Sequence, residues 1–333
     1  MASTQLNATT STPWESTSTL FYNYTSDEAV NEDDCIYEEY EKYFLPALYS
    51  LFFVVGFIGN ALVVWVITVG TQLKSTTDVC LLNLALADLL LVLSLPFRAY
   101  QMKHGWIFGE VMCTMVFTIH YIGFYSGIFF IVLMSIDRYL AIVHAVLALR
   151  VRTRVCGIVS SLVIWVLAVA ASFPELFYIR VENFSSEVLC IDYPNNVKLV
   201  TVGLFKTNIV GLLVPLSIMG FCYSMILRRL HRSRLPNKYS MRLIVIVVVV
   251  FFCCWTPFNI AEFIVALHFL GLAPHDCEFA KRFTLTLWIT EALTFSHSCL
   301  NPFLYVFVGE KFRRHLFRFF REHQSISSSE RAT

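Results

Sequence analysis

The sequence predicts an all-α membrane protein: a bundle of seven transmembrane helices followed by a short amphipathic eighth helix. Of the 333 residues, 57% are hydrophobic and only 15% are charged, whereas soluble proteins carry charge on about a quarter of their residues. Apolar runs near the ~20 residues that span a bilayer recur along the chain. The basic residues cluster between these runs, in connections that fall on one side of a membrane.

The spans are expected to be helices. A lipid-exposed backbone must satisfy its own hydrogen bonds, and no alternating ten-residue strand pattern occurs in the sequence. The seven expected spans are residues 46–69, 76–100, 110–140, 154–174, 200–227, 241–268 and 283–307. The expected organisation is an acidic N-terminal tail (1–45), a seven-helix domain (46–309), the amphipathic helix (310–321) and a cytoplasmic tail (322–333).

The connections fix the expected orientation. Basic residues follow the first span, separate the third from the fourth and the fifth from the sixth, and follow the seventh. Examples are Lys74, Arg150, Arg152, Arg154, Arg228, Arg229, Lys311 and Arg313. The positive-inside rule makes that side cytoplasmic, so the N-terminal tail lies outside the cell. Glycosylation sequons at Asn7, Asn23 and Asn183 all fall on the outer side.

The outer tail is strongly acidic, with nine acidic residues and one base, Lys42, in residues 1–45. This is a membrane pattern with an acidic tail, and it argues against nucleic-acid binding. Segment 310–321 alternates bases with Phe and Leu at helical spacing, which predicts a helix on the inner leaflet of the lipid bilayer.

Four of the ten cysteines lie in or beside outer segments, where oxidation is possible. They are Cys35, Cys113, Cys190 and Cys277. Four cysteines allow three pairings, and the sequence alone leaves all three open.

Polar residues inside the expected spans are candidates for function because they are costly in lipid. Asp88 is the clearest, and Asn60 and Asn301 are the others. The alternative is interhelical hydrogen bonding that only stabilises the bundle. Asp137 and Arg138 stand side by side after Val111–Ile136, a run without Asp, Glu, Lys or Arg. Taken alone, that pair also fits a salt-bridged helix end.

No enzyme constellation is present in the sequence. There is no His-Glu-x-x-His motif, glycine-rich phosphate loop or nucleophile elbow. The outer and intramembrane histidines, His120 and His297 among them, lack metal-ligand spacing. We therefore expect neither catalysis nor a metal centre, and structural or pocket roles for the histidines.

The nine residues Asp137-Arg138-Tyr139-Leu140-Ala141-Ile142-Val143-His144-Ala145 resemble the third-helix signature of chemokine receptors, within the rhodopsin-like (class A) G-protein-coupled receptors. Each of the other spans carries a landmark of that family in the correct order. These are Asn60, Asp88, Trp165, Pro215 with Tyr223, Cys254-Trp255-Thr256-Pro257, and Asn301-Pro302 with Tyr305. The match covers about 35–321.

Further segments resemble the CC type of chemokine receptor, among them Thr77-Asp78-Val79, Ser94-Leu95-Pro96-Phe97, Gly123-Phe124-Tyr125-Ser126-Gly127 and Gly309-Glu310-Lys311-Phe312. The resemblance implies a plasma-membrane receptor that binds a basic chemokine. It would activate inhibitory-class heterotrimeric G proteins, raise intracellular calcium and drive chemotaxis. A chemokine-scavenging receptor without G-protein signalling is the alternative, although such receptors usually have a damaged Asp-Arg-Tyr stretch. A transporter or light-driven pump is the third hypothesis, and 283–307 has no Lys to bind retinal.

The resemblance also assigns roles to residues. It selects the disulfides Cys113–Cys190 and Cys35–Cys277. It places Tyr49, Arg98, His120, Trp255 and Glu291 in the ligand pocket, and Asp137, Arg138, Tyr139, Tyr223 and Tyr305 in G-protein coupling. The acidic tail suits tyrosine sulfation at Tyr22, Tyr24, Tyr37 and Tyr40, and Ser325, Ser327, Ser328 and Ser329 are candidates for phosphorylation and arrestin docking.

A polar network of Asn60, Asp88, Ser298 and Asn301 is implied, with Asp88 binding Na⁺ or a proton at rest; no other cofactor is expected. In this network the chain departs from the family at two positions, with Gly127 in place of a frequent Ser and His297 in place of a frequent Asn.

Two expectations concern charged partners. The inner end of the sixth span reads Leu235-Pro236-Asn237-Lys238 and lacks the acid that locks Arg138 in some receptors. Only Asp137 is then expected to restrain Arg138. Arg98 stands where many chemokine receptors have Trp. One hypothesis is that it pairs with Glu291, the family's residue for the basic group of the ligand, across the empty pocket. The alternative is that it extends to the lipid headgroups without a specific partner.

Overall fold

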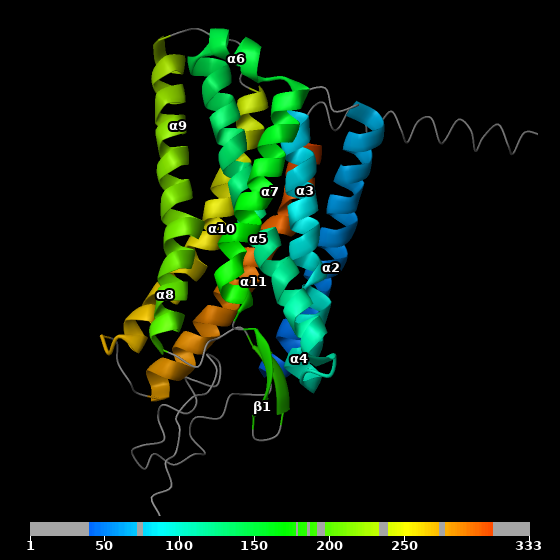
Figure 1. Cartoon of the computed structure of the whole chain (residues 1–333), viewed down its shortest axis with the longest axis vertical. Coiled ribbons are helices and arrows are strands. Elements are labelled where there is room, and N and C mark those ends of the chain that lie inside the picture. The colour runs from blue at the N-terminus through cyan, green and yellow to red at the C-terminus, as the bar shows by residue number, and fades with distance from the viewer. Residues whose placement is uncertain are drawn as a thin grey trace, which may run out of the picture.

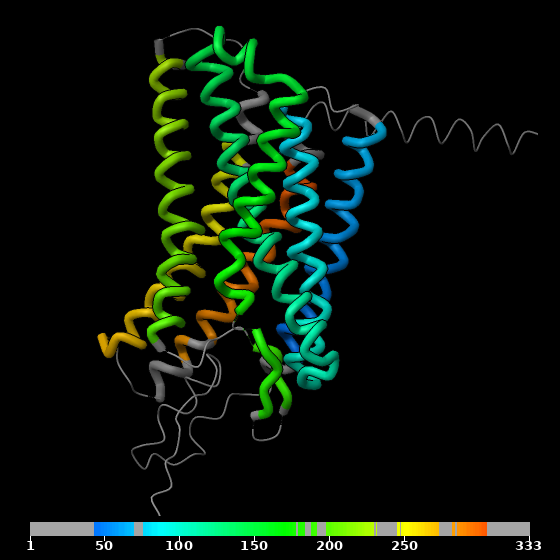
Figure 2. Tube along the Cα trace, in the orientation of Figure 1, coloured from blue at the N-terminus to red at the C-terminus, as the bar shows by residue number. Residues whose placement is uncertain are grey.

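Long helices run side by side in the computed structural model of the chain (Figures 1 and 2). The structure describes residues 40–71, 76–177, 179–184, 187–191, 197–232, 239–272 and 277–308. The helices are α2 (Tyr40–Trp65), its π-helical continuation η2 (Val66–Thr71), α3 (Thr76–Leu93), α4 (Leu95–His104), α5 (Gly109–Val143), α6 (Ala145–Val151), α7 (Arg154–Leu176), α8 (Val197–Asn208), the π-helix η3 (Ile209–Leu213), α9 (Val214–Arg232), α10 (Tyr239–Phe269) and α11 (Cys277–Val308). The strands are β1 (Arg180–Phe184) and β2 (Glu187–Ile191).

Six spans within the described residues are long and apolar enough to cross a membrane. They are Tyr43–Val69, Thr76–His104, Gly109–Val143, Arg154–Leu176, Lys198–Arg229 and Val248–Phe269. α11 is 32 residues long and packs along α10 and α2, so it supplies the seventh long helix. The predicted fold class is therefore confirmed, and each expected span is helical.

The second span bends where α3 gives way to α4. Pro96 has no backbone N–H, so one helical hydrogen bond cannot form there. The hydroxyl of Ser94, in the turn between the two helices, donates to the carbonyl of Leu91 at 2.7 Å. α4 begins directly after this turn, and Arg98 lies on its first turn.

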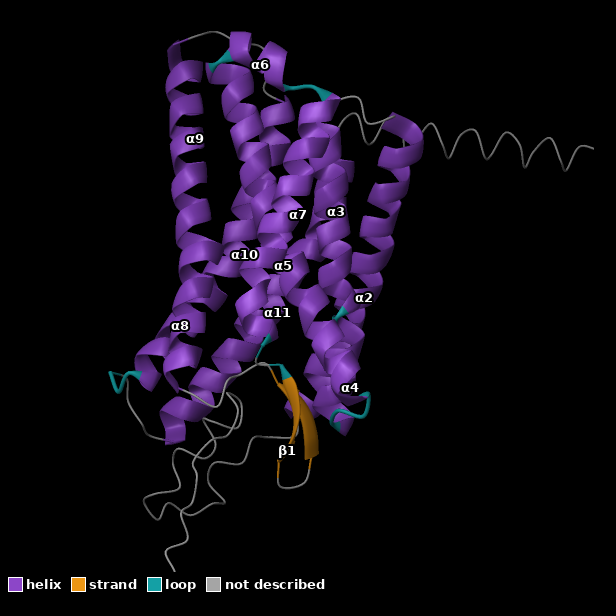
Figure 3. Cartoon of the chain, in the orientation of Figure 1, coloured by secondary structure: helices purple, strands orange, loops and turns teal. Residues whose placement is uncertain are grey.

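A hairpin lies at one end of the bundle and α6 at the other (Figures 1 and 3). β1 and β2 pair antiparallel, with Val181 opposite Cys190. The expected disulfide Cys113–Cys190 ties the hairpin to α5, with a Cα–Cα distance of 5.6 Å. The Gln101 side chain on α4 also accepts from the Cys190 N–H at 3.0 Å. The connection between α7 and α8 is thereby fixed over the outer ends of α4 and α5.

α5 packs against α3, α7, α9 and α10. Its contact with α3 depends on Gly123. A Cβ added there would lie 2.8 Å from the backbone nitrogen of Leu91 and 2.9 Å from the carbonyl oxygen of Ala87. Gly127, one turn further along α5, differs, because a Cβ there would meet nothing within 4 Å.

These two glycines form a matched pair for a stability test. Gly123→Ala should lower the thermal midpoint of the purified protein, because overpacking against backbone atoms costs ~1–3 kcal/mol. Gly127→Ala should leave the midpoint equal or higher, because Ala favours a helix by ~1 kcal/mol over Gly. Indistinguishable midpoints for the two variants would contradict the close approach of α3 to α5.

Candidate functional site

The outer half of the bundle holds a charged cluster contributed by α2, α4 and α11. Arg98 Nη2 lies 2.8 Å from Glu291 Oε1, so the expected pair is confirmed. Tyr49 donates its hydroxyl hydrogen to Glu291 Oε2 at 3.0 Å. Each oxygen of the carboxylate therefore has its own partner. The Arg98 and Glu291 side chains are 25% and 20% exposed, so the pair remains within reach of a molecule entering from outside.

Aromatic rings line this cluster. The guanidinium of Arg98 lies 5.7 Å from the ring centroid of Phe117 and 5.8 Å from that of Phe295. Both distances are within the range of a cation–π interaction. His120 is 5.7 Å from the Phe295 ring, and its Nδ1 lies 3.3 Å from the hydroxyl of Ser94. The rings keep Arg98 in place while its charge is paired.

Trp255 on α10 lies deeper, against Phe124 of α5. The two rings are stacked with centroids 4.4 Å apart. The indole N–H donates to His297 Nδ1 at 3.1 Å. The same nitrogen lies against the carbonyl of Thr294, but it cannot donate there while accepting from Trp255. The indole can only donate, so we assign the imidazole proton to Nε2.

That assignment points the His297 proton toward Asp88 on α3. Nε2 lies 3.6 Å from Asp88 Oδ1 and 3.3 Å from the Ser298 hydroxyl. Ser298 donates to Asp88 Oδ1 at 3.0 Å, and Asn301 donates to Oδ2 at 2.7 Å. Asn60 donates to the carbonyl of Ser298 at 2.9 Å. The predicted polar residues therefore meet at one point, and His297 extends the network to Trp255.

The oxygen atoms around Asp88 are ligands of the kind that a small hard cation such as Na⁺ takes. The carboxylate, the Ser298 hydroxyl and the Asn301 amide supply oxygens, and Asn60 Oδ1 is a buried oxygen without a hydrogen-bond partner. Among the described residues, no group of three His, Cys, Asp or Glu side chains could hold a metal ion.

The cytoplasmic end of α5 departs from the sequence-based expectation. Asp137 was expected to be the only restraint on Arg138, and that expectation is wrong. Arg138 Nη2 donates to the hydroxyl of Thr77 at 2.5 Å and is 3.6 Å from Asp137 Oδ2. The Asp137 carboxylate pairs more closely with Arg152, through Nε at 2.7 Å and Nη2 at 3.1 Å.

Sequence reasoning missed the roles of Thr77 and Arg152. In the sequence, Thr77 is recognisable only as part of a family motif, and Arg152 only as one of several basic loop residues. Neither lies at helical spacing from Asp137 in the sequence, so no local pattern could find the contact. The other predicted inner residues are placed as follows: the Tyr139 hydroxyl is 3.0 Å from His144 Nε2, and the Tyr223 hydroxyl is 3.4 Å from Ser135 Oγ.

Several predicted residues cannot be placed. The sites Cys35, Asn7, Asn23, Tyr22, Tyr24, Tyr37, Ser325, Ser327, Ser328, Ser329 and segment 310–321 lie outside the described residues. Tyr40, Cys277 and Tyr305 belong to helices, but their side chains are outside the description. Asn183 is exposed on β1. Its sequon, the second disulfide and the tail modifications stay predictions.

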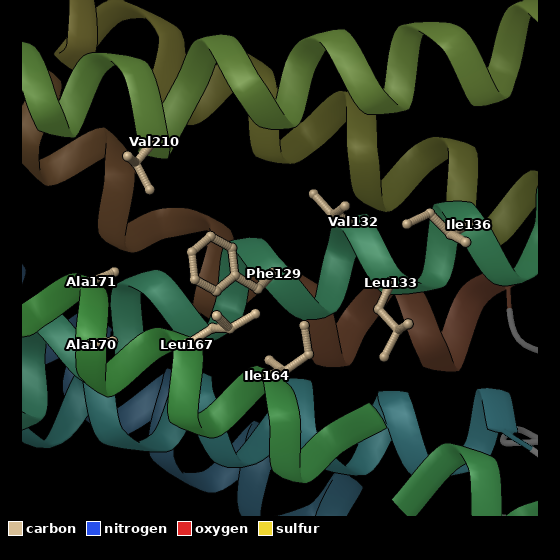
Figure 4. Close-up of a pocket in the computed structure, with 9 residues that line it drawn as sticks. All are labelled: Phe129, Val132, Leu133, Ile136, Ile164, Leu167, Ala170, Ala171 and Val210. Atoms are coloured by element: carbon tan, nitrogen blue, oxygen red, sulfur yellow. The ribbon is translucent and has the colours of Figure 1, made fainter. Parts of the chain in front are cut away.

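A cavity of about 490 Å³ opens between α5, α7 and η3 (Figure 4). It is lined by Phe129, Val132, Leu133, Ile136, Ile164, Leu167, Ala170, Ala171 and Val210. Every lining side chain is apolar. The cavity therefore lacks the charged and hydrogen-bonding groups of the Arg98–Glu291 cluster, and we place the candidate ligand site at that cluster.

Comparisons with known proteins agree with this geometry. Residues 59–305 match the family model "7 transmembrane receptor (rhodopsin family)". The chain is 44% identical over 284 residues to human C-C chemokine receptor type 8, covering 84% of this chain and 80% of that protein. It is 43% identical over 312 residues to human C-C chemokine receptor type 4, covering 89% and 86%. Human C-C chemokine receptor type 1 is 41% identical over 290 residues, covering 85% and 81%.

The charged cluster can be tested through stability. Arg98→Gln and Glu291→Gln should each destabilise the purified protein by ~1–2 kcal/mol, because each leaves a partly buried charge without its partner. The double variant should be less destabilised than the sum of the two, because no unpaired charge remains. Thermal midpoints of the four proteins measure this cycle. Strictly additive shifts would show that the pair is not formed in solution.

Proposed function

Because this chain belongs to the C-C chemokine receptors of the rhodopsin family of seven-transmembrane receptors, we propose that it binds a basic chemokine outside the cell and activates inhibitory-class G proteins inside it. It is a multi-pass plasma-membrane protein and not an enzyme. Chemokine binding would raise intracellular calcium and drive chemotaxis through those G proteins. The observation that carries the proposal is an intact Asp137-Arg138-Tyr139 stretch in which Arg138 is held mainly by one hydroxyl.

The outer face provides two steps of ligand capture. The acidic tail attracts a basic chemokine over a distance, which raises the rate of encounter. The amino terminus of the chemokine then enters the cluster around Glu291. Arg98 occupies one oxygen of that carboxylate and Tyr49 the other. The incoming ammonium group must therefore compete with Arg98, and this competition sets a threshold for activation.

The signal passes through the bundle by rearrangement of packed rings. A ligand that moves Arg98 also disturbs Phe295, whose ring contacts the Tyr49 and His120 rings. Trp255 lies below, hydrogen-bonded to His297. Movement there allows α10 to pivot near Pro257, where the missing N–H weakens the helix.

The inner face then opens. Arg138 leaves Thr77 and turns toward Tyr223 and Tyr305, and the space beside it accepts a helix of the G protein. Na⁺ at Asp88 would be held by Asp88, Ser298 and Asn301 and would supply positive charge that favours the resting arrangement. Phosphorylation at Ser325, Ser327, Ser328 and Ser329 would add negative charge for arrestin docking.

A chemokine-scavenging receptor is the alternative function. Such a receptor would keep the outer pocket and lose coupling at the inner face. The intact Asp-Arg-Tyr stretch and its contacts to Thr77 favour the signalling receptor. The transporter hypothesis is not supported, because the family to which the chain belongs consists of receptors.

Arg138→Ala should abolish ligand-stimulated nucleotide exchange on a purified inhibitory-class G protein, because the opened cavity loses its central contact. Chemokine binding should stay within a few-fold, since Arg138 is at the opposite end of the bundle from Glu291. Arg154→Ala, which removes an exposed charge at the same inner face, is the matched control and should retain exchange. Exchange that persists in Arg138→Ala would refute the assigned role.

A further inference from the structure

Arg152 and Arg138 approach the same carboxylate. Asp137 is only 4% exposed, so its charge needs a partner inside the protein. Arg152 meets both of its oxygens, at 2.7 Å and 3.1 Å. This two-point arrangement is the strongest form of a guanidinium–carboxylate contact. Arg138 Nη2 is 3.6 Å from Asp137 Oδ2, so its contact with the carboxylate is weaker than that of Arg152.

Thr77 joins the two arginines. Its hydroxyl donates to Asp137 Oδ2 at 3.1 Å and accepts from Arg138 at 2.5 Å. Arg152 Nη2 is 3.3 Å from the same hydroxyl. Arg138 Nε is buried without a hydrogen-bond partner. Arg138 is therefore incompletely satisfied in this arrangement, while Arg152 holds the carboxylate.

We propose that Arg152 is a positioning residue for G-protein coupling: it occupies Asp137 and thereby leaves Arg138 weakly held and ready to turn. The proposal rests on the proposed function. Arg152 follows directly on α6, so the same contact also docks this short helix of the second inner loop against the end of α5. One side chain thus sets both the freedom of Arg138 and the position of the loop.

Removing Arg152 has a definite direction in this arrangement. The Asp137 charge cannot remain unpaired in its buried position. Arg138 is already 3.6 Å away and would move onto the carboxylate. Arg138 must then break a charge-assisted bond before it can turn, so the resting state becomes more stable and coupling to the G protein falls. If Arg152 were instead a lock on the resting state, its removal would raise coupling.

Arg150 provides the matched control. It lies on α6 two residues before Arg152 and is exposed. Within the part of the chain that the structure describes, Arg150 makes no ion pair. Arg150→Gln therefore removes the same charge from the same loop while leaving Asp137 paired. Arg152→Lys keeps the charge at position 152 but loses the two-point contact, and it should fall between wild type and Arg152→Gln.

The test uses the full-length receptor in nanodiscs with a purified inhibitory-class G protein and no ligand. Arg152→Gln should lower the basal rate of nucleotide exchange about fivefold or more, the usual lower range for coupled sites. Arg150→Gln should match wild type. In an Asp137→Asn background, Arg152→Gln should cause no further fall, because the carboxylate charge for which the arginines compete is gone.

Unchanged or increased exchange in Arg152→Gln would overturn the proposal, as would an equal fall in the Asp137→Asn background. A wild-type receptor that shows no exchange above empty nanodiscs, even after addition of a C-C chemokine that it binds, would instead refute the proposed function. Amide hydrogen exchange on the receptor alone then decides about Arg152. Residues 145–152 should exchange faster in Arg152→Gln than in Arg150→Gln, and equal rates would show that the contact to Asp137 does not hold the loop.

Discussion

A buried carboxylate constrains the whole bundle. Asp88 is 1% exposed in the middle of a helix that crosses the membrane, where a charge without partners is costly. On α11, Ser298 and Asn301 donate hydrogen bonds to this carboxylate. On α2, Asn60 donates to the carbonyl of Ser298, which links α2 to the same network. The three helices α2, α3 and α11 are thereby held in one register. Apolar packing alone would tolerate neighbouring registers, whereas directed hydrogen bonds do not.

His297 extends this constraint toward the outer pocket. Its imidazole lies between Asp88 and Trp255, so the polar centre and the aromatic floor of the pocket share a residue. Trp255 in turn stacks on Phe124, and Phe295 of α11 contacts Tyr49 beside the charged cluster. A ligand that separates Arg98 from Glu291 acts on Phe295, which belongs to the same buried apolar cluster as Trp255 and Phe124. The outer pocket and the polar network around Asp88 are therefore connected through packed and hydrogen-bonded residues.

The sequence predicted the parts of the molecule that depend on composition and on pairwise charge. Hydrophobic length identified the spans, and the resemblance to chemokine receptors, together with opposite charges on neighbouring helices, indicated the Arg98–Glu291 pair. It failed where backbone geometry decides. The π-helical segments and the hairpin have no periodic signal. The side chain of Arg152 reaches Asp137 because the short helix α6 folds back on α5, and Thr77 reaches it because α3 packs against α5. An arginine in a basic loop looks the same in sequence whether it faces water or a buried carboxylate.

In the proposed function, the outer pocket and the inner face are two sites on one bundle that has two arrangements. Coupling of this kind is reciprocal, so a partner at one face must change affinity at the other. The direct measurement is the affinity of the purified receptor for a C-C chemokine that it binds, with and without nucleotide-free inhibitory-class G protein. We expect the G protein to tighten chemokine binding about fivefold or more. Equal affinities in the two conditions would contradict it.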